Sequence, residues 1–173
     1  MNRFYILVGS NIEPDINVKK GLNLIEESTE INLEAASTPY TSKAVGMDGD
    51  DFFNQALRCT TDLSFKETLS LLKAIEVTCG RERDPNNKFT PRTLDLDIIH
   101  WNDFDGVIEG YKLPDPDIKK YDYMSVPFAE KIAEMVITDF DVNWIKLRVS
   151  KPGALRFSKD VGVIIERTAS DYE

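Results

Sequence analysis

One segment of the sequence has two distinct faces: RTLDLDIIHW, residues 92–101. Alternate side chains of a β-strand point to opposite sides of its sheet. The two leucines and Ile98 therefore share one face, which we expect to be buried. Asp95 and Asp97 share the other face, about 7 Å apart along the strand. The segment predicts a strand that packs on one side and presents a pair of carboxylates on the other.

Three further strands are expected upstream of this segment. Runs of β-branched, aliphatic and aromatic residues indicate strands over residues 3–8, 33–42 and 52–61. The first of them ends at Gly9-Ser10-Asn11, a turn sequence.

Two helices are expected between the strands. Apolar residues spaced by four and three predict an amphipathic helix over about residues 17–27. The second helix opens at Ser64, which forms a capping box with Glu67 three residues later, and Gly80 supplies its stop.

The resulting order is β-α-β-β-α-β, the arrangement of an α+β, ferredoxin-like fold with both helices on one face of an antiparallel sheet. From Gly110 onward three prolines indicate a less regular region of extra C-terminal elements, and residues 150–173 read as a charged, variable tail. We expect a single domain over residues 1–173.

The composition restricts the class of function. A formal charge of −9 argues against a surface built for nucleic acid, and no apolar run approaches the length of a membrane span. Cys59 and Cys79 lack metal-ligand spacing, and His100 is the only histidine, which leaves little material for a zinc site or a Ser-His-Asp triad. We expect a cytoplasmic monomer that binds neither nucleic acid nor membrane.

Paired carboxylates on one strand face repel each other unless a cation lies between them. Mg²⁺ prefers oxygen ligands and commonly takes one or two carboxylates together with substrate phosphates. A lone D-x-D pattern is more often a solvent-facing polar stripe. Here Arg81, Arg83 and Arg92 lie close by in sequence, and guanidinium groups suit phosphate oxygens. There is no P-loop, so a nucleotide site would be of another type.

Six motifs follow one another along the chain: YILVGSN (5–11), AVG (44–46), FFN (52–54), GRER (80–83), PRTLDLDII (91–99) and VPFAE (126–130). With these motifs the chain resembles a known family, the 6-hydroxymethyl-7,8-dihydropterin pyrophosphokinases of folate biosynthesis. The resemblance covers about residues 3–130.

The resemblance implies transfer of pyrophosphate from ATP to the hydroxymethyl group of the pterin, leaving AMP. It implies that Asp95 and Asp97 hold Mg²⁺, two ions in all. The residues that match catalytic positions are Arg81, Arg92 and Asp97. Those that match ATP-binding positions are Glu76, Arg81, Arg83, Arg92 and Ile98. Those that match pterin-binding positions are Ser42, Val45, Phe52, Asn54 and Tyr123.

Each assignment has a structural alternative. Arg81 and Arg83 suit a solvated helix end paired with neighbouring acids, and Glu76 suits a cap on nearby backbone. Phe52 and Tyr123 suit ordinary core packing, the commoner fate of aromatic residues. Asn54 counts against that alternative for Phe52, because a buried amide needs hydrogen-bonding partners.

The sequence departs from the family pattern in four places, two of them single residues and two of them pairs. Asp115 and Tyr121 stand where a histidine and an arginine are usual, Phe89-Thr90 replaces a Trp-Gly pair, and Lys43-Ala44 replaces a Pro-Pro pair. The favoured interpretation is an active pyrophosphokinase with a variant ATP pocket. One alternative is a diverged relative that binds a pterin or nucleotide without efficient transfer. Another is a ferredoxin-like interaction domain whose D-x-D is incidental.

Overall fold

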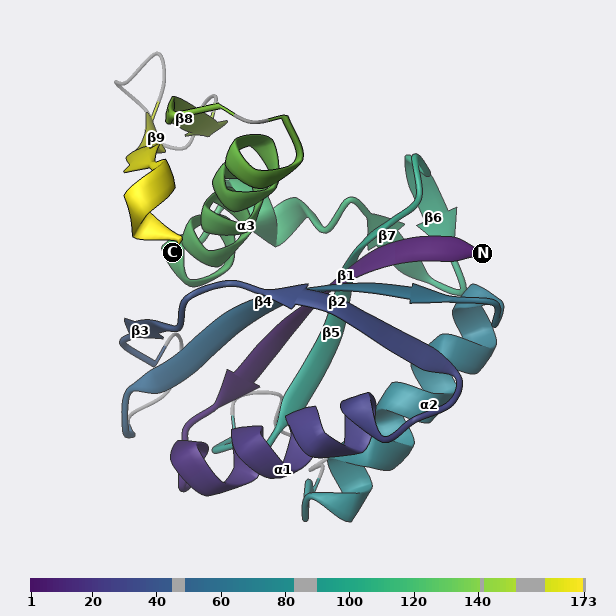
Figure 1. Ribbon diagram of the computed structural model, residues 1–173. Coiled ribbons are helices and arrows are strands. Elements are labelled where there is room, and N and C mark those ends of the chain that lie inside the picture. The colour runs from purple at the N-terminus through teal and green to yellow at the C-terminus, as the bar shows by residue number, and fades with distance from the viewer. Residues whose placement is uncertain (45–48, 83–89, 141, 152–160, 173) are drawn as a thin grey trace.

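An antiparallel sheet lies between two layers of helix in the computed structural model, with α1 and α2 on one face and α3 on the other (Figure 1). The structure describes residues 1–44, 49–82, 90–140, 142–151 and 161–172. In chain order the elements are β1 (Asn2–Ser10), α1 (Pro14–Glu26), β2 (Ile31–Ala36), β3 (Tyr40–Ser42), β4 (Phe52–Thr61), α2 (Phe65–Thr78), β5 (Asp95–Trp101), β6 (Gly106–Ile108), β7 (Tyr111–Leu113), η1 (Pro116–Lys119), α3 (Asp122–Phe140), β8 (Trp144–Lys151), β9 (Val161–Thr168) and η2 (Ala169–Asp171).

The order of strands in the sheet is β2-β4-β1-β5, with β3 also pairing to β4. The central strand β1 runs antiparallel to both β4 and β5. Its register places Gly9 opposite Asp95 and Leu7 opposite Asp97. The expected α+β, ferredoxin-like arrangement is confirmed, and it brings the end of the first strand beside the carboxylates.

The two faces of β5 are as the alternation predicts. Leu96 and Ile98 belong to the core beneath α1 and α2, whereas Ile99 packs with Leu7 on the α3 side. A β-bulge between β1 and β5 then shifts the register by one residue, so that Trp101 joins the core beneath α1 and α2. The carboxylates are thus held on a strand whose other face is fully packed.

Local signals define the two expected helices. Pro14 occupies the first turn of α1, where its missing N–H costs nothing, and the helix begins three residues before the expected position. The capping box of α2 is present: the Glu67 carboxylate accepts from the Ser64 N–H at 2.9 Å, and the Ser64 hydroxyl accepts from the Glu67 N–H at 3.4 Å. Gly80 follows α2 with a φ of +79°, a left-handed conformation that glycine adopts without strain.

The strand expected over residues 33–42 is in fact two strands, β2 and β3. Ser37 leaves the ladder, and its hydroxyl accepts from the Ala56 N–H at 3.0 Å. Pro39 has no N–H to donate and interrupts the pairing.

The region after Gly110 contains the extra C-terminal elements that were expected, and it is more regular than its prolines indicate. α3 is a helix of 19 residues that contains Pro127. Its buried Ala129 and Ala133 pack against Ile165 of the β8–β9 hairpin, so the tail also has regular structure. No helix within the described ranges is long and apolar enough to cross a membrane.

Candidate active site

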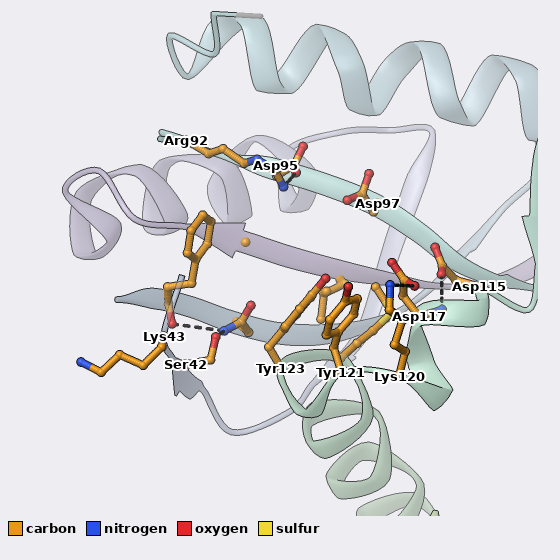
Figure 2. Close-up of a pocket in the computed structure, with 15 residues that line it drawn as sticks. Ser42, Lys43, Arg92, Asp95, Asp97, Asp115, Asp117, Lys120, Tyr121 and Tyr123 are labelled. Atoms are coloured by element: carbon orange, nitrogen blue, oxygen red, sulfur yellow. Dashed lines mark hydrogen bonds and ion pairs between the residues drawn. The ribbon is translucent and has the colours of Figure 1, made fainter. Parts of the chain in front are cut away.

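A cavity of about 400 Å³ opens on the α3 side of the sheet (Figure 2). Its floor includes Leu7 and Gly9 of β1, and one wall carries Asp95 and Asp97 of β5. Figure 2 shows Tyr121 and Tyr123 reaching toward these carboxylates from the opposite wall. Gly9 contributes to the open floor, since a side-chain carbon there would lie 3.8 Å from the Cβ of Asp95.

Arg92 is fixed by the turn that ends β1. Its N–H donates to the Asn11 side-chain oxygen at 2.7 Å, and its carbonyl accepts from the Asn11 N–H at 3.0 Å. The Ser10 hydroxyl donates to the Thr93 carbonyl at 2.7 Å. The guanidinium then forms an ion pair with Asp95 and lies 6.0 Å from the centroid of the Phe52 ring. The Gly9-Ser10-Asn11 turn therefore positions the residue that faces both carboxylate and aromatic ring.

Asp97 carries an electrostatic cost. The cavity walls desolvate its carboxyl group and the Asp95 carboxylate repels its charge, which together raise its pKa to about 6. Its side chain is still 44% exposed, so the carboxylate faces the open cavity. A hard cation between the two aspartates would relieve this repulsion.

Sequence reasoning missed Lys73, which approaches the carboxylates from α2. Its ammonium donates to Glu76 at 2.6 Å and lies 3.6 Å from the nearer Asp97 oxygen. Glu76, 1% exposed, also accepts the Leu96 N–H of β5 at 2.8 Å. The spacing of Lys73 and Glu76, three residues apart on one helix, was the available signal, but their approach to β5 is a tertiary contact.

The opposite wall is aromatic. The rings of Tyr121 and Tyr123 are stacked, with centroids 5.3 Å apart and planes inclined by 20°. Phe52 and Asn54 reach the same cavity from β4. The Asn54 amide nitrogen donates to the Tyr40 carbonyl and the Ser42 hydroxyl, both at 3.0 Å. These bonds to β3 orient its side-chain oxygen, which suits a donor on a flat heterocycle.

The departures at Asp115 and Tyr121 have visible consequences. Asp115 accepts from the Asp117 N–H at 2.8 Å and so caps η1, and burial raises the pKa of its carboxyl. Lys120 lies with its ammonium 4.4 Å from the centroid of the Tyr121 ring and 3.9 Å from Asp117. Lys112 instead pairs with Asp105. Of these lysines, Lys120 is the one that brings positive charge to the cavity.

The cavity gathers seven of the residues expected from the sequence: Ser42, Phe52, Asn54, Arg92, Asp95, Asp97 and Tyr123. Three others do not line it. Arg81 donates to the Pro91 carbonyl at 3.3 Å, beside Arg92. Glu76 is buried behind β5. The Ile98 side chain lies in the core beneath α1 and α2, so Ile98 would contact ATP only through its main chain. Arg83 and Val45 fall outside the described residues.

The donor set fits Mg²⁺. Asp95 and Asp97 offer hard oxygen ligands beside space for a substrate. Within the described ranges, no group of three or more His, Cys, Asp or Glu side chains is arranged to hold a metal.

The site combines three features: carboxylates suited to Mg²⁺, a cation beside them and an aromatic wall across the cavity. Together they define a class of site, one for metal-dependent phosphoryl transfer to an aromatic substrate. The model of the 7,8-dihydro-6-hydroxymethylpterin-pyrophosphokinase (HPPK) family matches residues 5–133. The chain belongs to this family of enzymes, which transfer pyrophosphate from ATP to hydroxymethyldihydropterin in folate biosynthesis.

Curated relatives agree with this assignment. The 2-amino-4-hydroxy-6-hydroxymethyldihydropteridine pyrophosphokinase of Aquifex aeolicus is 33% identical over 132 residues, 75% of this chain and 80% of that protein. The enzyme of the same name from Pseudomonas aeruginosa is 30% identical over 141 residues, 80% of this chain and 86% of that protein. The bifunctional protein FolKE of Lactococcus lactis is 34% identical over 116 residues, 66% of this chain but 33% of that longer protein.

Proposed function

We propose that this chain transfers the pyrophosphoryl group of ATP to 6-hydroxymethyl-7,8-dihydropterin, with Asp95 and Asp97 holding two Mg²⁺ ions. One observation carries the proposal: the two carboxylates and the aromatic residues Phe52 and Tyr123 line the same cavity of about 400 Å³. A phosphate chain and a flat ring can therefore be held side by side, and proximity of this kind is a large part of catalysis between two substrates.

The bound ions supply neutralisation of the phosphate charge and polarisation of the transferred group. The protein's own residues bind and orient the substrates. Arg92, anchored at its backbone by Asn11, presents a guanidinium to phosphate oxygens. Arg81, on the Pro91 carbonyl next to it, is assigned as a second phosphate contact. We assign Arg83, Glu76 and the main chain of Ile98 to the rest of the ATP site on the basis of the family motif.

The pterin is assigned to the aromatic side of the cavity. Phe52 and Tyr123 offer ring faces, which favour a flat heterocycle through stacking and burial. The side-chain oxygen of Asn54 is assigned to accept an N–H of the pterin, with Ser42 and Val45 beside it. Asn54 suits this role because its amide nitrogen is already committed to protein acceptors.

The hydroxyl proton of the pterin is assigned to the Asp97 carboxylate, which faces the open cavity and lines it together with the aromatic residues. A cytoplasmic monomer completes the proposal; the free Cys59 and Cys79, both buried, suit a reducing compartment.

The test is AMP formation by the purified protein with MgATP and 6-hydroxymethyl-7,8-dihydropterin. We expect AMP release that requires the pterin, and loss of turnover by at least about a hundredfold in Asp97→Asn, since charge stabilisation of this kind is worth several kcal/mol. Pterin binding without AMP above the level of an enzyme-free control would instead favour the diverged binding protein, for which Asp115 and Tyr121 are the supporting departures.

A further inference from the structure

Three carboxylates and two cations meet where α2 approaches β5. The carboxylates are Glu76, Asp95 and Asp97, and the cations are Arg92 and Lys73. With all five groups ionised, the cluster carries a net charge of −1. Each of the aspartates assigned to metal thus already has a cation of the protein within 4 Å.

Lys73 is held near Asp97 by contacts with other groups. Its ammonium donates to the buried Glu76 at 2.6 Å and to the Leu96 carbonyl at 3.4 Å. The Leu96 N–H donates to the same Glu76 carboxylate. These contacts tie the lysine to the edge of β5, so its charge stays near Asp97 whether or not the 3.6 Å contact with that carboxylate persists.

A fixed ammonium and a divalent cation on the same carboxylate repel each other. At an effective dielectric constant between those of the protein surface and water, the repulsion would be worth on the order of tenfold or more in binding. The triphosphate chain of ATP would reverse this balance, because it brings negative charge that both cations attract.

We propose that Lys73 is a positioning residue that acts as the built-in counter-ion of Asp97 and weakens metal binding to the nucleotide-free site. Glu76 is the anchor that holds Lys73 in this place. The inference rests on the proposed function, since it takes Asp95 and Asp97 as the metal ligands.

The test is Mn²⁺ binding to the nucleotide-free protein, followed by electron paramagnetic resonance at about pH 8, where the carboxylates are ionised. Lys73→Met keeps the length of the aliphatic stem and removes the charge. We expect it to bind Mn²⁺ about tenfold more tightly than the unmodified protein, and at least threefold. Lys73→Arg keeps the charge and should stay within about twofold of the unmodified protein.

Two further variants separate the possible causes. Lys66→Met removes an exposed lysine from the first turn of the same helix and should leave Mn²⁺ affinity unchanged. Asp97→Asn should lose the binding. An affinity in Lys73→Met that is less than threefold tighter, unchanged or weaker overturns the inference while leaving the metal site intact. Undiminished binding in Asp97→Asn would instead overturn the proposed metal ligands.

The same variants give a second, opposite readout with a non-hydrolysable ATP analogue and Mg²⁺. Because Lys73 attracts the phosphate chain, Lys73→Met should bind the analogue more weakly, by about threefold or more, while Lys73→Arg remains near the unmodified protein. Equal affinity of both variants for the analogue would contradict the placement of the Lys73 charge beside the nucleotide.

Discussion

Asp97 combines a functional position with a cost to stability. Its folded pKa of about 6 lies above the ordinary 3.8, so the fold disfavours the ionised carboxylate. A carboxyl group whose pKa is raised by folding lowers the stability of the protein as the pH rises from its unfolded pKa to its folded pKa. The full cost is present above about pH 6. Functional carboxylates often carry such a cost because they await a cation.

Asp97→Asn should therefore stabilise the nucleotide-free protein while abolishing turnover. At about pH 8 we expect a gain of about 1 kcal/mol in the free energy of unfolding, a figure discounted because the side chain is 44% exposed. The gain should disappear below about pH 4, where Asp97 is protonated in both states. Urea denaturation at the two pH values measures it, and a variant that is less stable at pH 8 would contradict the electrostatic account.

Phe52 lines the cavity and does not belong to the main core cluster. Phe52→Ala should weaken pterin binding by about 1 to 3 kcal/mol through lost stacking and burial. Phe52→Leu keeps apolar bulk without a ring, so its pterin affinity should fall between those of the unmodified protein and Phe52→Ala. Calorimetric titration with the pterin and an ATP analogue checks both, and unchanged affinity in the alanine variant would remove Phe52 from the site.

Strand alternation explains why several site residues could be predicted from the sequence. Asp95 and Asp97 had to share a face, and so did Phe52 and Asn54, once their strands were recognised. Lys73 could not be found in this way, because only the packing of α2 against the edge of β5 brings it to Asp97. Lys120 likewise depends on where η1 places it.

A buried carboxylate of α2 contacts the outer edge of β5. Glu76 accepts from both the Leu96 N–H and Lys73, and within the described residues no other strand pairs with that edge. The contact fixes the position of β5 relative to α2. This link between the two elements accounts for the burial of Glu76.

Removing this carboxylate should loosen the site. Glu76→Ala leaves the Leu96 N–H and the Lys73 ammonium without their buried acceptor, which should cost about 2 to 3 kcal/mol of stability. Val77→Ala, at the neighbouring exposed position, should change stability by less than about 0.5 kcal/mol. Chemical denaturation of both variants checks the difference; equal stabilities would show that Glu76 does not clamp β5.

Elements with clear local signals were predictable, and those that depend on tertiary contacts were not. The capping box of α2 and the alternation of β5 each specify their structure over a few residues. Pro127 argued against a helix, yet α3 continues through it because Ala129 and Ala133 are buried by the sheet and hairpin. Burial of an apolar face outweighs one lost hydrogen bond.

The molecule extends beyond the part that matches its family. The family match ends at residue 133, whereas the β8–β9 hairpin begins at Trp144. The hairpin is fastened to α3 by the ion pair of Arg167 with the buried Glu130 and by the packing of Ile165. These contacts lie outside the cavity that holds Asp97, and they brace the helix that carries Tyr123.

Arg167→Met should lower the stability of the protein without a large fall in AMP formation. It leaves the buried Glu130 without its guanidinium, and we expect a loss of about 1 to 3 kcal/mol in the free energy of unfolding. Lys146→Met removes an ion pair with Glu166 on the exposed face of the same hairpin and should cost under about 1 kcal/mol. Denaturation curves and AMP assays on both variants test this; a large fall in AMP formation by folded Arg167→Met would place the hairpin in the catalytic machinery.

The central claim is that two carboxylates and an aromatic wall in one cavity direct a pyrophosphoryl group from ATP to a pterin. Phosphorus NMR of a reaction containing MgATP, 6-hydroxymethyl-7,8-dihydropterin and the purified protein tests it most directly. We predict AMP and the pterin diphosphate in equal amounts, with no ADP. ADP with a pterin monophosphate, or ATP that stays intact while the pterin is bound, would contradict the claim.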